Sequence, residues 1–285
     1  MTPSTGISCS KISTLVSDVD GTLVTDDKIL TVRAQAAVAK LSACGINFAI
    51  ISSRPPRGLG MLLRPLGITT PVCGFNGGVI ATRDLTVITE HLLSPEVARC
   101  AVSLLDTHDV QVWVFSGQDW LVRDCDEPYV RFEERTVGFR PTLVDNFGQS
   151  LHAANKIVGV SADFERLAQC EREMRATLSR SQSYYLDITH PLANKGVALS
   201  EIARLLAVPL AEIAVIGDGG NDIAMFERSG LSIAMGNASP EVRQAADFVT
   251  DSNRDDGFAN AVDRFILGGD RSNVQVVIAR AAGHA

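Results

Sequence analysis

A short, largely apolar segment, residues 12–16, runs directly into the polar stretch Ser17-Asp18-Val19-Asp20-Gly21-Thr22-Leu23. Residues 31–43 then show the spacing of an amphipathic helix, which Thr31 caps and Gly45 ends. Residues 46–51 have the composition of a buried strand. A strand, a helix and a second strand within about forty residues predict the βαβ unit of a parallel sheet. Loops at the carboxyl ends of such strands share one edge, where ligands bind.

Asp18 and Asp20 stand two residues apart at the end of the first predicted strand. Because strand side chains alternate between faces, both carboxylates should point the same way, while Val19 points back into the protein. Two carboxylates held that close repel each other unless a metal ion, a proton or a cationic side chain lies beside them. Gly21 permits a sharp turn. The stretch therefore predicts a ligand site, although a simple acidic turn accounts for it equally well when it is taken alone.

The composition is that of an ordinary globular protein, with 285 residues, 46% hydrophobic and 21% charged. That length suits one large domain or a domain that carries an inserted one. A net charge of −7 argues against a nucleic-acid partner and against a polybasic membrane patch. The six cysteines include no Cys-x-x-Cys pair, which indicates a reducing compartment. The start resembles no signal peptide and no apolar run is long, so we expect a cytoplasmic protein.

Polar residues also follow the next two predicted strands. Ser52-Ser53-Arg54 ends the second strand, and the prolines that come next suit the first turn of a helix. Hydroxyls and backbone N–H groups at a helix start can bind an anion, although a plain helix cap is the more common role. Asn76-Gly77-Gly78 forms a flexible loop at the end of a third strand, where a turn explains Asn76 as well as a binding role does.

From about Arg83 the pattern changes to mixed helices and antiparallel strands, and this predicts an α+β module inserted into the parallel sheet. We assign residues 1–82 and 188–285 to a Rossmann-like core, with 268–285 as a peripheral tail, and residues 83–187 to the inserted module. Within the module we expect helices from Ser94-Pro95, over 128–137 and over 163–179, a hairpin of 110–115 with 120–123, and strands over 156–160 and 184–188.

The parallel pattern returns with Asn194-Lys195-Gly196, which opens a helix to about Leu206. A buried strand over 213–216 ends in Gly217-Asp218-Gly219-Gly220-Asn221-Asp222, which starts a helix over 223–228. Strands over 231–235 and 248–249 and a helix near 257–265 complete the sheet, and residues 274–278 can add an edge strand.

Four of these polar features should therefore meet at one edge of the sheet: Asp18 with Asp20, Ser52, Lys195, and Asp218 with Asp222. Three or four carboxylates with one lysine suit a hard divalent cation such as Mg²⁺ together with a phosphate. A single lysine acts there as a point charge for anionic oxygens.

This order of motifs resembles the haloacid dehalogenase-like superfamily of phosphohydrolases: Asp-x-Asp-Gly-Thr-Leu, a hydroxyl residue after a buried strand, Asn-Lys-Gly, then Gly-Asp-x-x-Asn-Asp. The insertion between Asn76-Gly77 and Lys195 resembles the Cof-type branch, which carries an α/β cap there. The resemblance covers residues from about 12 to 265. One departure is Ser52-Ser53-Arg54, where Cof-type proteins usually read Thr-Gly-Arg, so that Ser53 replaces a glycine.

The resemblance implies a role for each matching residue. Asp18 would be the nucleophile that forms an aspartyl-phosphate, and Asp20 the general acid and then the general base. Mg²⁺ would be bound by Asp18, the Asp20 backbone carbonyl and Asp218, with Asp222 supporting the metal or the lysine from behind. The phosphoryl group would be bound by a further set of polar residues: Ser52, Ser53, Lys195, Asn221 and Asn76.

The sequence thus predicts a Mg²⁺-dependent phosphatase for a small phosphorylated metabolite, either a sugar phosphate or a phosphorylated cofactor. A phosphotransferase or phosphomutase, or a non-catalytic regulator that binds a small molecule on the same scaffold, are the alternatives. In the inserted module, Trp113, Trp120 and Arg123 are candidates to face the substrate, although Trp113 on an alternating strand favours a core position. Arg54 is expected to anchor its loop. The oligomeric state cannot be read from the sequence.

Overall fold

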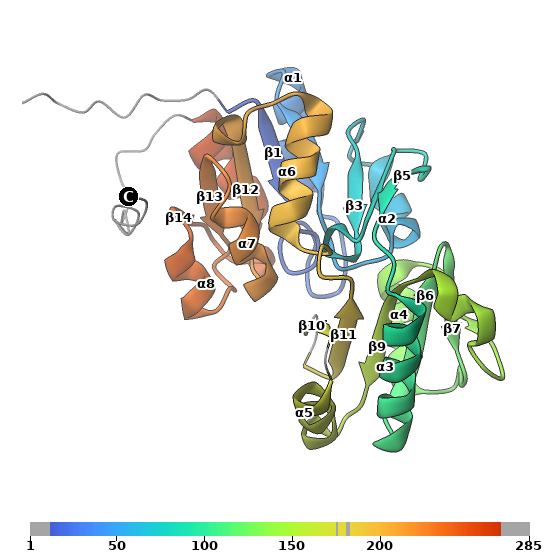
Figure 1. Ribbon diagram of the computed structural model, residues 1–285. Helices are drawn as coiled ribbons and strands as arrows, with labels where there is room; N and C mark the ends of the chain where they lie inside the picture. Colours follow the sequence, from blue (N-terminus) through green and yellow to red (C-terminus); the bar gives the residue numbers. More distant parts are fainter. Residues whose placement is uncertain (1–11, 175, 181–182, 269–285) are drawn as a thin grey trace, which may run out of the picture.

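A computed structural model describes residues 12–174, 176–180 and 183–268 (Figure 1). Its central sheet has five parallel strands in the order β14-β13-β12-β1-β2. These strands are β1 Thr14–Ser17, β2 Asn47–Ile50, β12 Ile213–Gly217, β13 Leu231–Ala234 and β14 Phe248–Val249. β1 and β12 are hydrogen-bonded neighbours in this sheet, although they lie about two hundred positions apart in the chain. The predicted parallel-sheet core is confirmed.

Helices cover both faces of this sheet. Leu15 of β1 packs into the hydrophobic cluster on one face, and the next residue, Val16, packs into the cluster on the other, as strand alternation requires. Thr31 caps the first helix as predicted, because its hydroxyl accepts the Ala34 N–H at 3.1 Å. The helices of the two faces are α1 Val32–Ala43, α2 Pro56–Leu63 and α9 Gly257–Ala261 on the first, and α6 Lys195–Leu206, α7 Ile223–Phe226 and α8 Pro240–Ala245 on the second.

A small antiparallel sheet leads away from this core. Its strands are β3 Val72–Gly74, β4 Val79–Ala81 and β5 Val87–Glu90, in that order. Short non-α turns link other elements of the chain: 3₁₀ turns at Phe75–Gly77, Gly148–Ala153, Leu210–Glu212, Gly220–Asp222 and Asn253–Asp255, and a π-helical turn at Val262–Leu267. Because β5 pairs with β4, the change of pattern at about Arg83 marks this hairpin. The division of the chain after residues 82 and 187 stays a prediction.

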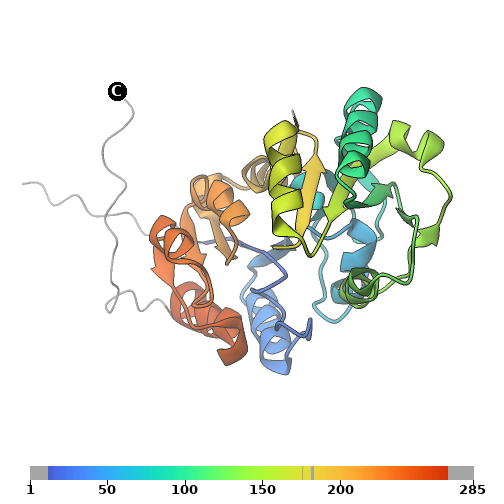
Figure 2. The ribbon, with the colours of Figure 1, turned by 90° about the horizontal axis from the view of Figure 1, so that it is seen from below.

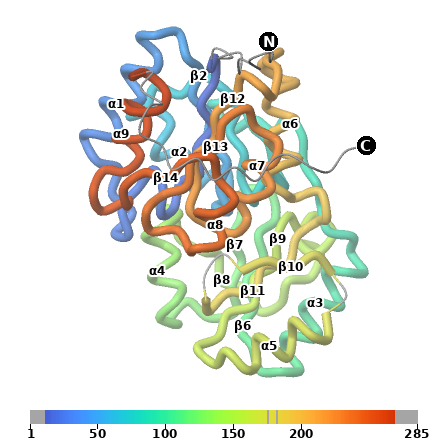
Figure 3. Tube along the Cα trace, turned by 90° about the vertical axis from the view of Figure 1, so that its left-hand side faces the viewer, coloured from blue at the N-terminus to red at the C-terminus, as the bar shows by residue number. Residues whose placement is uncertain are grey.

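A second, mixed sheet, here called the cap sheet, has six strands in the order β10-β11-β9-β6-β7-β8. All its pairs are antiparallel except β7 with β8. Figure 3 shows the cap sheet below the parallel sheet, and Figure 2 shows α3 and α5 on one side of its strands. The elements of this part are α3 Pro95–Thr107, β6 Gln111–Ser116, β7 Asp119–Val122, α4 Pro128–Val137, β8 Thr142–Leu143, β9 Ala154–Val160, α5 Phe164–Glu173, β10 Thr177–Ser179 and β11 Tyr185–Thr189.

Several predicted elements need correction. The helix expected over 163–179 ends at Glu173, and Thr177–Ser179 instead forms strand β10, which pairs with β11. The helix expected over 223–228 is the single turn α7. The edge strand expected over 274–278 lies outside the described residues. Within the described part of the chain, no helix is both long and apolar enough to cross a membrane.

Candidate active site

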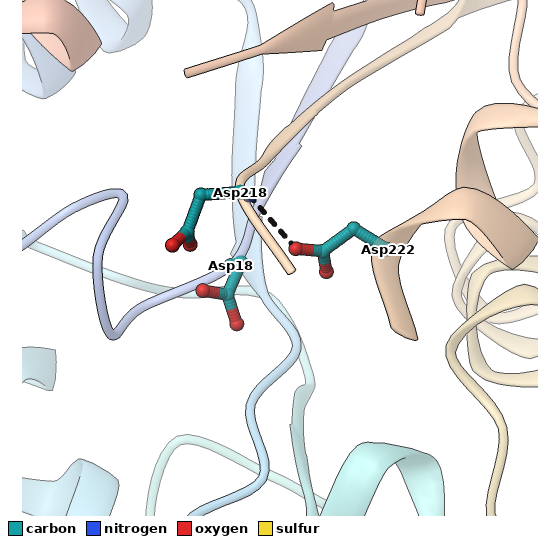
Figure 4. Close-up of side chains that lie close together, drawn as sticks. All are labelled: Asp18, Asp218 and Asp222. Carbon is teal, nitrogen blue, oxygen red and sulfur yellow. Dashed lines mark hydrogen bonds between the residues drawn. The ribbon is translucent and has the colours of Figure 1, made fainter. Parts of the chain in front are cut away.

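Three carboxylates meet at the carboxyl edge of the parallel sheet. Asp18 directly follows β1, Asp218 directly follows β12, and Asp222 lies four residues further on. Figure 4 shows the three side chains turned toward one another. Each can offer one oxygen such that these atoms all lie within 4.8 Å of one another. Asp18 is 6% exposed and Asp222 is fully buried.

Lys195 joins two of these carboxylates. Its Nζ lies 2.6 Å from Asp18 Oδ1 and 2.5 Å from Asp222 Oδ1, and the residue is only 1% exposed. It reaches the edge from the first turn of α6, whereas Asp18 and Asp218 directly follow strands. Asn194 caps this helix, since its side-chain oxygen accepts the N–H groups of Gly196 and Val197. The cap therefore fixes where the lysine enters the site.

Asp222 is fully engaged by protein donors. Its Oδ2 accepts the N–H groups of Asp218 at 2.9 Å and Gly219 at 2.8 Å, while Oδ1 contacts Lys195. The carboxylate packs against Gly217 so closely that a Cβ there would lie 2.4 Å from Asp222 Cγ. Asp222 thus holds the lysine and the Asp218 loop in place.

Asp218 is oriented by the loop that follows β1. Its Oδ1 accepts the Thr22 hydroxyl at 2.9 Å, and its Oδ2 accepts the Asn237 amide at 3.2 Å. Gly21 has φ +84°, and a Cβ at that position would lie 2.3 Å from Asp218 Oδ2. Glycine is needed at position 21 both for the backbone conformation and for this close approach.

The cluster holds more carboxylates than cations. Burial raises the pKa of Asp18 well above its usual value; the Lys195 ammonium opposes this shift, and Asp222 and Asp218 add to it. Burial, followed by the charge of Asp222, raises the pKa of Asp218 to about 6. Three carboxylates thus share one ammonium. Asp18 Oδ2, together with the Asp218 carboxylate, whose donors Thr22 and Asn237 are neutral, fits a hard divalent cation such as Mg²⁺.

Asp20 has different partners from Asp18. Arg54 donates from Nε and from Nη2 to the two Asp20 oxygens, both at 2.7 Å, and Lys28 Nζ lies 2.8 Å from Oδ1. Burial alone would raise the pKa of Asp20, but the Arg54 hydrogen bonds and the charges of Arg54 and Lys28 lower it to about 2. Arg54 also donates to the Thr136 carbonyl of α4 at 2.6 Å. Arg54 was expected only to anchor its own loop, but it also binds Asp20 and the cap helix α4.

The predicted phosphate-binding residues are linked to one another. The Ser52 carbonyl accepts the Asn76 N–H at 2.8 Å, and the Asn76 side chain accepts the Asn221 amide at 3.0 Å. The Ser52 hydroxyl is fully buried and accepts the Arg54 N–H at 3.1 Å. Ser53 and Asn221 line the cavity described next, whereas Ser52 and Asn76 do not.

A cavity of about 440 Å³ lies between these residues and the cap sheet. Asp18, Asp20 and Asp218 line its core side. Trp113 is fully buried, as its strand position favoured, and it also lines the cavity; Trp120 and Arg123 do not. The remaining cap residues that line it are Phe115, Phe132, Glu133, Thr136, Lys156, Val158, Arg180 and Tyr185.

Sequence reasoning missed Lys28, Asn237, and the polar cap residues Glu133, Lys156 and Tyr185. Asn237 was open to detection, since it follows β13 at the same edge as the other site residues. A lysine inside the run Asn155-Lys156-Ile157-Val158 was a second signal, because a cation in a buried strand needs a partner.

Comparisons with known proteins agree with this geometry. Residues 15–262 match the model of a family described as haloacid dehalogenase-like hydrolase. A 5-amino-6-(5-phospho-D-ribitylamino)uracil phosphatase of Bacillus subtilis is 25% identical, over 88% of this chain and 97% of its own length. An HMP-PP phosphatase of Cronobacter sakazakii is 28% identical, over 79% of this chain and 84% of its own length.

A solved haloacid dehalogenase-like hydrolase from Bacteroides thetaiotaomicron superposes with a TM-score of 0.82 and 26% identity, covering 89% of this chain and 99% of its own. The family match extends from β1 to the end of the described parallel sheet and includes all four acidic and basic residues of the cluster around Lys195. This chain belongs to the haloacid dehalogenase-like hydrolases.

Proposed function

We propose that the protein is a Mg²⁺-dependent phosphatase that hydrolyses small phosphomonoesters through an aspartyl-phosphate on Asp18. The observation that carries this proposal is the Lys195 bridge between Asp18 and Asp222. The bridge engages Asp18 through Oδ1, so that Oδ2 is left for an incoming group on a side chain that lines the cavity. The names of the two phosphatase relatives support a small phosphorylated substrate.

Asp18 attacks phosphorus and the ester oxygen leaves, so that one difficult hydrolysis becomes two easier displacements. Lys195 offsets the negative charge that gathers on the phosphoryl oxygens and holds Asp18 in place. Asp18, Asp218 and the Asp20 carbonyl would hold Mg²⁺, which supplies a positive charge against the phosphoryl oxygens when it is bound. Ser53 and Asn221, which line the cavity, would contact the phosphoryl group. Asn76 would hold Asn221, and the Ser52 carbonyl would hold Asn76.

Asp20 moves the proton in both displacements. In the arrangement described here it is a carboxylate held by Arg54 and Lys28, which suits the second displacement, where it takes a proton from the attacking water. In the first displacement the same carboxyl gives a proton to the leaving oxygen. It must therefore loosen one of these contacts as substrate enters.

The test is phosphate release from a panel of sugar phosphates, phosphorylated cofactors and p-nitrophenyl phosphate, with MgCl₂ and with EDTA. We expect release that requires Mg²⁺. An isomeric phosphate ester in place of free phosphate would identify a phosphomutase. Binding of a phosphate ester without either product would indicate a non-catalytic regulator.

A further inference from the structure

The cap side of the cavity is built from one face of the cap sheet. In β6, β9 and β11, alternate side chains face the cavity, and those between them pack under α3 and α5. The pairing places Phe115 opposite Lys156, and Val158 opposite both Trp113 and Asp187. We call six lining residues the cap wall: Trp113, Phe115, Lys156, Val158 and Tyr185 of the cap sheet, and Glu133 of α4.

Lys156 is the cation of the cap wall, and it is already paired. Its side chain is 7% exposed, and its Nζ lies 2.9 Å from Oδ1 of Asp187, which is fully buried. Neither Asp187 oxygen accepts a well-aligned hydrogen bond from the described residues. The carboxylate therefore depends on Lys156 for its charge balance, and the lysine is not free to neutralise a second anion.

The other cations that line the cavity are paired too. Lys28 and Arg54 both contact Asp20, and Arg180 contacts Glu171 at 2.8 Å. Thus each lysine or arginine that lines the cavity, among the described residues, has a carboxylate partner. A second anionic group on a substrate would therefore meet only paired cations on the cap side, of which Arg180 is the most exposed.

Glu133 adds a carboxyl to this side. It projects from α4 beside Tyr185, whose hydroxyl lies 3.3 Å from Glu133 Oε2. Burial raises the pKa of Glu133 to about 7, with Lys156 opposing the shift and Asp20 adding to it. Above that pH the cap wall is negative at this point, and it repels an anionic leaving group.

The cap wall also offers hydrogen-bonding groups to a neutral leaving group. A Glu133 carboxylate accepts hydrogen bonds, and the Lys156 ammonium has donors beyond the one that faces Asp187. Hydroxyl groups, which both donate and accept, can satisfy both.

We propose that the cap wall selects an uncharged leaving group that carries hydroxyl groups, and that Glu133 is the residue that rejects a second anionic group, while Lys156 is held by Asp187. This inference rests on the proposed phosphatase function. It predicts that a neutral sugar or polyol monophosphate is a better substrate than its analogue with a carboxylate or a second phosphate.

The experiment compares matched substrates at pH 8, where Glu133 is ionised. Glucose 6-phosphate is paired with 6-phosphogluconate, and fructose 6-phosphate with fructose 1,6-bisphosphate. Within each pair, the ratio of kcat/KM values does not depend on how much of the enzyme is folded. We expect the wild-type ratio to favour the neutral partner at least tenfold. In Glu133→Gln we expect the ratio to fall at least threefold, because kcat/KM for the charged partner rises.

Glu134→Gln is the matched control. Glu134 is the next residue of α4, but it contacts Arg140 and does not line the cavity. The ratio of kcat/KM values for the neutral and charged substrates should therefore be the same in Glu134→Gln as in the wild type. A gain on the charged substrate is a change that a merely misfolded variant cannot produce.

Two results would overturn the inference while leaving the phosphatase intact: a wild-type ratio near one, or a Glu133→Gln ratio equal to that of the wild type. Turnover of p-nitrophenyl phosphate with none of the neutral sugar phosphates would overturn it as well. Absence of Mg²⁺-dependent turnover of any substrate, p-nitrophenyl phosphate included, would instead overturn the proposed function, and this inference with it.

Discussion

At the scale of single residues, Asp18 is the group on which the proposed chemistry depends. It is 6% exposed, it borders the cavity, and Lys195 contacts it directly. Asp222, although just as close to the lysine, is held on both oxygens by protein donors. Among the described residues, Asp18 keeps an oxygen without a protein donor and Asp222 does not, which is why we propose Asp18 as the attacking group.

We expect Asp18→Asn to lower Mg²⁺-dependent phosphate release by about 10³-fold or more, since an amide cannot act as the nucleophile. The fold should persist, because the amide has nearly the same shape. Circular dichroism and phosphate release measure the two effects. Asp27→Asn, an exposed change on the neighbouring loop, is the control and should keep full activity. A folded Asp18→Asn protein with a near wild-type rate would rule out Asp18 as the nucleophile.

Lys195→Met should destabilise the protein strongly. The substitution keeps most of the side-chain volume but leaves Asp18 and Asp222 buried without their common cation, which costs about 3–5 kcal/mol of unfolding free energy. Urea denaturation without metal measures this cost. Lys40→Met removes an exposed ion pair with Asp263 and should cost about 0–1 kcal/mol. Equal losses in the two variants would show that the buried bridge is no stronger than a surface pair.

At the scale of elements, local signals predicted most of the parallel sheet. Its strands are short apolar runs that end in polar loops, and its helices carry recognisable caps such as Thr31 and Asn194. Because the edge of a parallel sheet brings strand ends together, the cluster of Asp18, Lys195 and Asp218 could be predicted from the sequence alone.

The cap wall could not be predicted in the same way. Whether Lys156 meets Asp187 depends on the register of β9 against β11, in which Lys156 lies opposite Thr189 and diagonal to Asp187. Because α5 and β10 separate β9 from β11 in the chain, no tight turn between the two strands fixes that register. The pairing of β10 with β11 explains why α5 ends earlier than predicted, since residues 177–179 form hydrogen bonds with β11 in place of a last helical turn. Tertiary pairing overrode helix propensity there.

The start of α6 offers a test at this scale. Asn194→Ala removes the helix cap and should cost about 1 kcal/mol of unfolding free energy. Lys195 is the next residue, so loss of the cap should also misplace the lysine. We therefore expect kcat to fall by a larger factor than the fraction of folded protein does. Ser94→Ala is the control, because it removes the cap of α3, which is far from the cluster in sequence. This substitution should cost a similar unfolding free energy and leave kcat unchanged. If both variants lost the same fraction of activity, the cap of α6 would have no special part in placing the lysine.

At the scale of the whole molecule, the cap sheet and the parallel sheet meet around the cavity through a few side chains. Arg54 joins Asp20 to the Thr136 carbonyl, the Arg57 guanidinium lies 4.3 Å from the Phe139 ring centroid, and the Phe75 and Phe115 rings lie 5.6 Å apart. Charge at the core end of the cavity is therefore coupled to the placement of the cap. Binding of a cation there should therefore raise the stability of the whole protein.

We expect Mg²⁺ to stabilise the protein more at pH 7.5 than at pH 5.5. Because burial raises the pKa of Asp218 to about 6, the metal-free folded protein holds a proton that the unfolded chain releases near pH 4. Metal-free stability therefore falls as pH rises through this window. Above pH 6 the carboxylate is free to bind Mg²⁺, and a concentration of about 100 Kd adds about 2.7 kcal/mol. Below pH 6, protons compete with the metal and the gain shrinks.

Thermal unfolding with MgCl₂ and with EDTA at the two pH values measures this difference in Tm. Asp218→Asn should abolish the shift at both, because an amide is a weaker ligand and carries no charge. Asp247→Asn is a suitable control, since Asp247 bonds Ser232 away from the cluster. A Mg²⁺ shift that is equal at pH 5.5 and 7.5, or that survives in Asp218→Asn, would place the stabilising ion elsewhere and remove Asp218 from the proposed metal site.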